Sequence, residues 1–150
     1  MRRVLINAEK CQGCKNCSIA CMQAHRDEGS VYDLDLAGKN CESANTILMD
    51  ADKNYKPLIC RHCAAPACAK NCMSGALIKD KTSGHVIYKQ EKCAQCFVCI
   101  MSCPFGVLKT NHDATAIVKC DFCHKTGGEP SCAKNCPTQT LTVQEVEVSL

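Results

Sequence analysis

The chain contains no tryptophan, only three tyrosines and three phenylalanines, and no uninterrupted apolar segment long enough to cross a membrane as a helix. Leucine, isoleucine, valine and phenylalanine together make up about 19% of its 150 residues. That share is low for a conventional hydrophobic core. Something other than large apolar side chains must therefore supply much of the folding free energy.

The chain also lacks the signals of several protein classes. Its first residues, MRRVLINAEKC, include two arginines but no apolar export segment and no cleavage site, so we expect a cytoplasmic protein with no membrane span. Lysine and arginine are scattered without a run of five, so a nucleic-acid partner is not expected despite the formal charge of +3. No paired carboxylates, nucleophile–base pair or phosphate loop stands out, and we expect no catalytic residue.

Cysteine, in contrast, is abundant. Sixteen of the seventeen cysteines form four quartets: Cys11, Cys14, Cys17 and Cys21; Cys60, Cys63, Cys68 and Cys72; Cys93, Cys96, Cys99 and Cys103; Cys120, Cys123, Cys132 and Cys136. Four thiolates are the ligand set of one 4Fe–4S cluster. We therefore predict four 4Fe–4S clusters and an electron-transfer role. Each bound cluster with its thiolates carries a charge of 2−, so the loaded protein has a net charge of about −5.

The third quartet, in CAQCFVCIMSCP, has the spacing of bacterial ferredoxins, in which the first three cysteines bind one cluster and the fourth binds another. Proline after the fourth cysteine turns the chain out of the site. Pro104 and Pro137 meet this expectation, whereas Met22 and Met73 replace proline in the other two quartets.

Several alternatives remain open at this point. Zinc also binds pairs of the form C-x2-C, although zinc sites usually use two well-separated pairs; a zinc-rich interaction module is therefore the remote alternative. Cys41 is either a free thiol or a ligand shared with a partner. His62 and His124 lie in or beside ligand loops, where hydrogen bonds or charge would tune cluster potentials. The iron-free chain is expected to be largely unfolded.

Short periodic segments between the quartets predict short secondary structure. We expect a strand in VLINA before Cys11 and a helix after Cys14 that carries Cys17 and Cys21 on one face. Further strands are expected at 46–50 and 141–148, with hairpins at 76–89 and 106–119. The stretch 26–45 is expected to be a surface loop, either a partner-binding segment or a plain linker.

The order of the quartets, the phrase CRHCAAPAC and the hairpins between quartets resemble the four-cluster ferredoxin-like subunits of dimethyl sulfoxide reductase, formate dehydrogenase and hydrogenases. The resemblance implies an α+β fold of two packed ferredoxin-like modules, with clusters filling the core. The outer module would comprise 1–45 and 107–150, and the inner module 46–106. The implied ligand sets are Cys11, Cys14, Cys17 and Cys136; Cys120, Cys123, Cys132 and Cys21; Cys60, Cys63, Cys68 and Cys103; Cys93, Cys96, Cys99 and Cys72.

Within this family the segments SIACMQAHRDEG and VYDLDL are most similar to CooF-type proteins, the small partners of nickel-dependent carbon monoxide dehydrogenase. The similarity implies electron transfer from that enzyme to a ferredoxin, a hydrogenase or a flavin oxidoreductase. The alternative is the iron–sulfur subunit of a molybdenum or tungsten oxidoreductase, or of a hydrogenase.

Overall fold

The computed structural model describes residues 1–26, 29–36 and 42–146. Within these residues the strands form four antiparallel pairs: β1 (Arg2–Ile6) with β8 (Leu141–Glu145), β2 (Thr46–Met49) with β3 (Tyr55–Leu58), β4 (Leu77–Lys79) with β5 (Val86–Tyr88), and β6 (Lys109–Thr110) with β7 (Ile117–Val118). The α-helices are α1 (Asn16–Ala24), α2 (Ala67–Lys70), α3 (Val98–Met101) and α4 (Ser131–Lys134). Short 3-10 turns are η1 (Ala8–Lys10), η2 (Val31–Asp33), η3 (Gln90–Lys92) and η4 (His124–Thr126).

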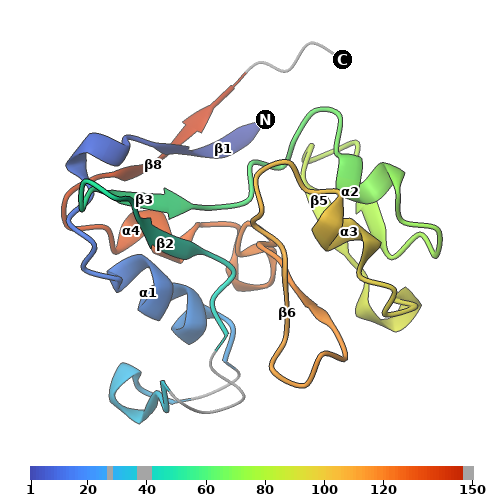
Figure 1. Ribbon diagram of the computed structural model, residues 1–150, viewed down its shortest axis with the longest axis horizontal. Helices are drawn as coiled ribbons and strands as arrows, with labels where there is room; N and C mark the ends of the chain where they lie inside the picture. Colours follow the sequence, from blue (N-terminus) through green and yellow to red (C-terminus); the bar gives the residue numbers. More distant parts are fainter. Residues whose placement is uncertain (27–28, 37–41, 147–150) are drawn as a thin grey trace.

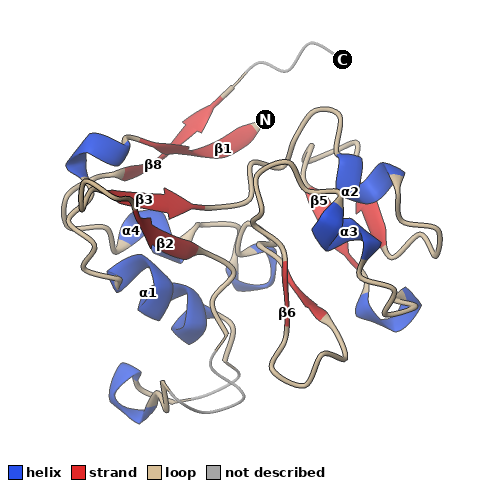
Figure 2. Ribbon diagram, viewed as in Figure 1, coloured by secondary structure: helices blue, strands red, loops and turns tan. Residues whose placement is uncertain are grey.

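The elements gather in two lobes (Figures 1 and 2). One lobe holds β1, β8, β2, β3, α1 and α4, and the other holds α2, α3 and the β4–β5 hairpin, with the β6–β7 hairpin beside it. The expected α+β fold with short elements is confirmed. No helix of the described residues is long and apolar enough to cross a membrane.

The first lobe contains segments from both ends of the chain. β1 pairs with β8 from Arg2 opposite Glu145 to Ile6 opposite Leu141. Leu141 is 2% exposed and packs with Cys17, Ile59 and Cys132 in one hydrophobic group. The first and fourth quartets are thereby held side by side, and α1 also packs against α4.

A second hydrophobic group contains Cys68, Leu77, Val86, Cys99, Leu108 and Ile117. Each group is thus built around the third cysteines of two quartets, Cys17 with Cys132 and Cys68 with Cys99. The packing crosses the expected module boundaries at two hairpins. Ile59, which follows β3, packs with cysteines of the outer quartets. Leu108 and Ile117, at the β6–β7 hairpin, pack with cysteines of the inner quartets.

Most predicted elements are confirmed, including the helix after Cys14, the strand beginning at residue 46 and both hairpins. β3 was not predicted, because Pro57 and Lys56 give its four residues no strand-like pattern. β8 ends at Glu145, and 147–150 lie outside the described residues. In the expected loop, Tyr32 is 94% exposed, but Ser43 to Asn45 are buried.

Candidate iron–sulfur centres

Every quartet begins with a loop through its first two cysteines and continues into a helix that carries the third. These third cysteines, Cys17, Cys68, Cys99 and Cys132, are 6–9% exposed, so all four point into the protein. Cys21 also lies in α1 and is buried. The pattern explains how a chain with few large apolar residues still forms two cores, because the helices bury ligands where other proteins bury leucine.

One backbone feature recurs in all four loops. The residue just before the second cysteine has a positive φ: Gly13 (69°), His62 (44°), Gln95 (56°) and Phe122 (60°). This conformation costs a non-glycine residue about 1–2 kcal/mol, and it helps turn successive backbone N–H groups toward one side, which forms an anion-binding concavity. Only one of the four residues is glycine, so this repeat escapes sequence reasoning.

A second repeat follows three of the fourth cysteines. The carbonyl groups of Cys72, Cys103 and Cys136 each accept a hydrogen bond at 3.2 Å from the backbone N–H three residues later. Met73 therefore lies in a turn of the same type as the turns that contain Pro104 and Pro137. Cys21 differs, because α1 continues through Met22 to Ala24.

One cavity directly shows four thiols together. Cys72, Cys93, Cys96 and Cys99 line a small cavity, which they share mainly with apolar side chains such as Leu77 and Ile117. Burial raises the pKa of the Cys99 thiol, and the like charges of Cys72, Cys93 and Cys96 raise it further. The fourth cysteine of the second quartet thus faces the first three of the third.

At the other quartets, too, the fourth cysteine of one quartet lies beside the first three cysteines of another. Burial is the main cause of a raised pKa at Cys17, Cys68 and Cys132, where it reaches about 12 at Cys132. The like charges that add to it come from the following neighbours: Cys136 and Cys14 beside Cys17; Cys60 and Cys103 beside Cys68; Cys21 and Cys123 beside Cys132. Cys11 and Cys63 lie on the same loops as Cys14 and Cys60.

Two further pairs of neighbouring cysteines connect one group of thiols to another. Cys17 also raises the pKa of Cys132, and Cys60 raises that of the half-buried Cys120. Cys68 and Cys99 pack in one hydrophobic group. The four groups therefore form a row in the order of the first, fourth, second and third quartets. Cys14 and Cys96, in the two end groups, are exposed, whereas Cys123 in a middle group is buried.

Four thiol donors in each group are the ligand set of a 4Fe–4S cluster. A tetrahedral zinc site would place its sulfurs about 3.8 Å apart, given Zn–S distances of about 2.3 Å. Among the described residues, no three His, Cys, Asp or Glu side chains converge on one position in that way. Thiolates that bind the separate iron corners of a cube stand farther apart, and sulfur is the usual ligand of 4Fe–4S clusters.

Hydrogen bonds to sulfur distinguish several fourth cysteines. Burial raises the pKa of Cys72 and Cys136, but hydrogen bonds from the backbone N–H of Leu77 and Leu141 and from the hydroxyls of Ser74 and Thr138 outweigh it, so both pKa values are lowered. Donors of this kind stabilise a thiolate.

Cys21 has a different environment. His25 Nδ1 lies 2.8 Å from its carbonyl oxygen and 3.9 Å from its sulfur, and His25 Nε2 lies 2.9 Å from Asp121 Oδ1 in the fourth quartet. Asp121 first, and then Cys21, raise the pKa of His25 to about 11. The imidazolium ties the end of α1 to the fourth ligand loop, a role that sequence reasoning missed because the partners are 96 residues apart.

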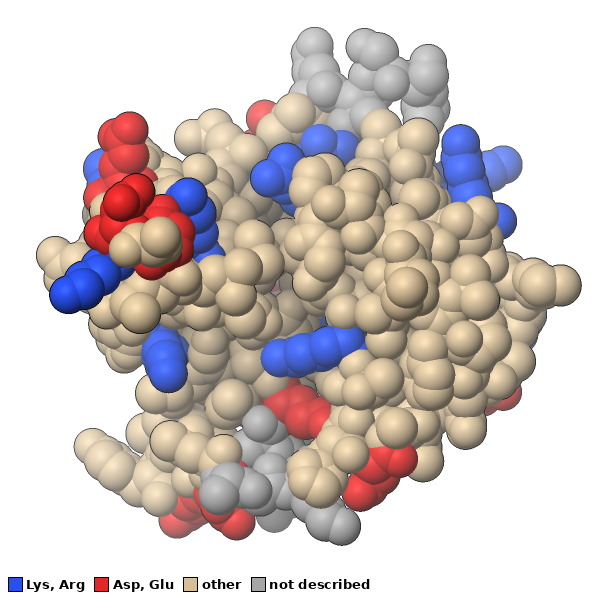
Figure 3. Space-filling view, viewed as in Figure 1, with Lys and Arg blue, Asp and Glu red and all other residues tan. Residues whose placement is uncertain are grey.

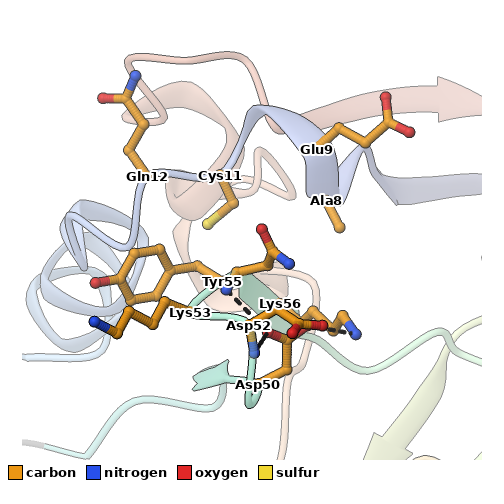
Figure 4. A pocket seen from close by; sticks show the side chains of 10 residues that line it. Ala8, Glu9, Cys11, Gln12, Asp50, Asp52, Lys53, Tyr55 and Lys56 are labelled. Carbon is orange, nitrogen blue, oxygen red and sulfur yellow. Dashed lines mark hydrogen bonds and ion pairs between the residues drawn. The ribbon is translucent and has the colours of Figure 1, made fainter.

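A hollow borders the first quartet (Figure 4). The Cys11 sulfur points into it from one side, and the β2–β3 turn forms the other, where Lys56 and Asp50 form an ion pair at 2.9 Å. Tyr55 also lines the hollow, and its ring covers Gly13 so closely that a Cβ atom there would lie 2.6 Å away. The first quartet is therefore both supported by β3 and open to the surface.

The two histidines expected near ligand loops differ. His124 lies in η4 and is exposed. His62 is 2% exposed, and its Nδ1 accepts a hydrogen bond from the N–H of Val86. Burial first, and then the charges of Lys119, His85 and Lys79, lower its pKa to about 2. Cys41 lies outside the described residues.

Comparison with known proteins agrees with this arrangement. Residues 51–146 match the family model of the 4Fe-4S dicluster domain. The probable anaerobic dimethyl sulfoxide reductase chain YnfG of Escherichia coli (strain K12) is 31% identical over 150 residues, which are 95% of this chain and 72% of that protein. The iron-sulfur subunit of nitrate-inducible formate dehydrogenase from the same strain is 34% identical, over 91% of this chain and 52% of that protein.

A solved structure with a similar fold is the active site complex BamBC of benzoyl coenzyme A reductase as isolated. It has a TM-score of 0.52 and 22% identity, over 99% of this chain and 80% of that one. The site and fold thus define an iron–sulfur electron-transfer protein. The chain belongs to the 4Fe-4S dicluster domain family and carries four 4Fe–4S clusters.

Proposed function

We propose that the chain is the electron-transfer subunit of an anaerobic oxidoreductase complex, in which it connects a catalytic subunit to a downstream acceptor. When bound, each 4Fe–4S cluster supplies a one-electron site. The proposed ligand sets are Cys11, Cys14, Cys17 and Cys136; Cys120, Cys123, Cys132 and Cys21; Cys60, Cys63, Cys68 and Cys103; Cys93, Cys96, Cys99 and Cys72.

The observation that carries this proposal is the row of thiol groups. Cys17 neighbours Cys132, Cys120 neighbours Cys60, and Cys68 packs in one hydrophobic group with Cys99, so each group lies beside the next. The exposed Cys14 and Cys96 belong to the two ends of the row. A partner can therefore approach either end, while the protein shields the middle.

The similar proteins named above bear on which catalytic subunit is the partner. They are a dimethyl sulfoxide reductase chain and a formate dehydrogenase subunit, so a catalytic subunit of that kind is favoured over carbon monoxide dehydrogenase. Anaerobic affinity purification of the tagged chain from its native cells, with mass spectrometry and metal analysis, tests this. A molybdenum or tungsten oxidoreductase or a hydrogenase is expected, and recovery of a nickel carbon monoxide dehydrogenase would reverse the order of preference.

Paired serine substitutions test the ligand sets. The protein should contain about sixteen irons with matching sulfide. Cys14→Ser and Cys136→Ser belong to one proposed set, so the double variant should lose no more iron than either single variant, about four per chain. Cys14→Ser with Cys132→Ser is the matched control, because Cys132 is in the same quartet as Cys136 but in another set, and this pair should lose about eight. Equal losses in both doubles would contradict the proposed exchange.

A further inference from the structure

Two lysines stand where the middle ligand loops meet. Lys79, at the end of β4, donates hydrogen bonds from Nζ to the carbonyl oxygens of Cys63 at 2.7 Å and His62 at 3.1 Å. Lys119 donates from Nζ to the carbonyl oxygens of Cys120 at 2.6 Å and Val86 at 2.5 Å. Lys79 is therefore fixed against the second cysteine of the second quartet, and Lys119 against the first cysteine of the fourth.

Together, the charges of Lys79 and Lys119 act on thiols of both middle groups. Lys119 acts on Cys120 in the fourth quartet and on Cys68 in the second, and Lys79 acts on Cys60 and Cys63. Both side chains are partly buried, and among the described residues neither forms an ion pair with a carboxylate. Figure 3 shows basic side chains, with acidic ones close by, in the region between the two lobes.

Within the described part of the chain neither ammonium group is paired with a carboxylate, and both lie beside the two proposed middle clusters. Each cluster with its thiolates changes from 2− to 3− on reduction, and a partly buried ammonium group nearby is screened less than a surface charge. We propose that Lys79 and Lys119 stabilise the reduced state of the two middle clusters and raise their reduction potentials. This inference rests on the proposed ligand sets.

The chain offers a matched control. Lys92 directly precedes Cys93, as Lys119 directly precedes Cys120, but Lys92 is exposed. Its charge is therefore screened by solvent and ions. Lys92→Gln removes the same charge at the same position relative to a quartet, without touching the junction.

The experiment is an anaerobic redox titration of the full, cluster-loaded chain, followed by electron paramagnetic resonance. Lys119→Gln should make reduction of two of the four clusters about tenfold less favourable, which corresponds to about 59 mV for one electron. Lys79→Gln should act in the same direction, and the double variant more strongly. Lys119→Arg should keep most of the original potentials, and Lys92→Gln should change them by less than threefold in the reduction equilibrium.

Iron and sulfide analysis separates the possible failures. If Lys119→Gln keeps about sixteen irons and its four potentials are unchanged, the role of the lysines is wrong while the proposed function stands. Equal shifts in Lys119→Gln and Lys92→Gln would also overturn it, because they would show a general effect of net charge. If the unmodified protein holds far fewer irons, the proposed function itself fails. Should Lys119→Gln lose iron, Lys79→Gln and Lys119→Arg still decide the question.

Discussion

Gly13 is the residue at which backbone conformation and packing coincide. Its φ is +69°, and a Cβ atom would lie 2.6 Å from the Tyr55 ring. We expect Gly13→Ala to destabilise the first ligand loop by more than the 1–2 kcal/mol of left-handed strain alone. Iron content should fall by about four per chain, the content of one cluster, and the thermal midpoint should fall as well.

Gly75 provides the control for this prediction. Its φ is +66°, but a Cβ atom at this position would have no neighbour within 4 Å, so Gly75→Ala introduces strain without the clash. The Gly13 variant should therefore be the less stable of the two. If both variants melt together and keep all their iron, the contact with Tyr55 is unimportant.

The ion pair of His25 and Asp121 permits a second prediction at this scale. Asp121→Asn removes the charge that holds the imidazolium between α1 and the fourth loop, and hydrogen bonds to charged groups contribute about 1.5–3 kcal/mol. We expect a lower thermal midpoint by anaerobic circular dichroism. Glu129→Gln, which removes the more exposed ion pair with Arg2 at 2.8 Å, should have a smaller effect; a larger one would contradict this ranking.

At the scale of the element, the two methionines that follow a fourth cysteine lie in different local structures. Met73 lies in a turn closed by the same 3.2 Å hydrogen bond as the turn that contains Pro104, whereas Met22 lies inside α1. Met73→Pro should therefore keep all the iron. Met22→Pro should break α1 at a cost of about 3 kcal/mol or more and lose iron from the two outer clusters. Iron analysis of both variants checks this, and equal loss from both would refute the shared turn.

The elements also show how far sequence reasoning reached. Ligand spacing is a local property, so the quartets predicted the helix after Cys14 and the number of clusters. The left-handed residues were hidden because His62, Gln95 and Phe122 are not glycine. The positions of Lys79 and Lys119 depend on how separate hairpins pack, and no local pattern records that.

At the scale of the whole molecule, the two hydrophobic groups are small and each is built around buried cysteines. Removal of iron leaves buried thiols without their metal, and the free energy of metal binding is lost from folding. We expect chelation under anaerobic, reducing conditions to abolish the cooperative melt in far-ultraviolet circular dichroism. Addition of zinc should not restore it, whereas reconstitution with iron and sulfide should; a native-like melt of the iron-free chain would contradict this.

The pairing of β1 with β8 has a consequence for biosynthesis. Cys11, Cys14 and Cys17 leave the ribosome early, but Cys136, which we propose completes their ligand set, is made more than a hundred residues later. The second and third quartets need no such wait, since all their thiols lie between Cys60 and Cys103. Cofactor insertion should therefore begin in the middle of the nascent polypeptide and finish at its two ends.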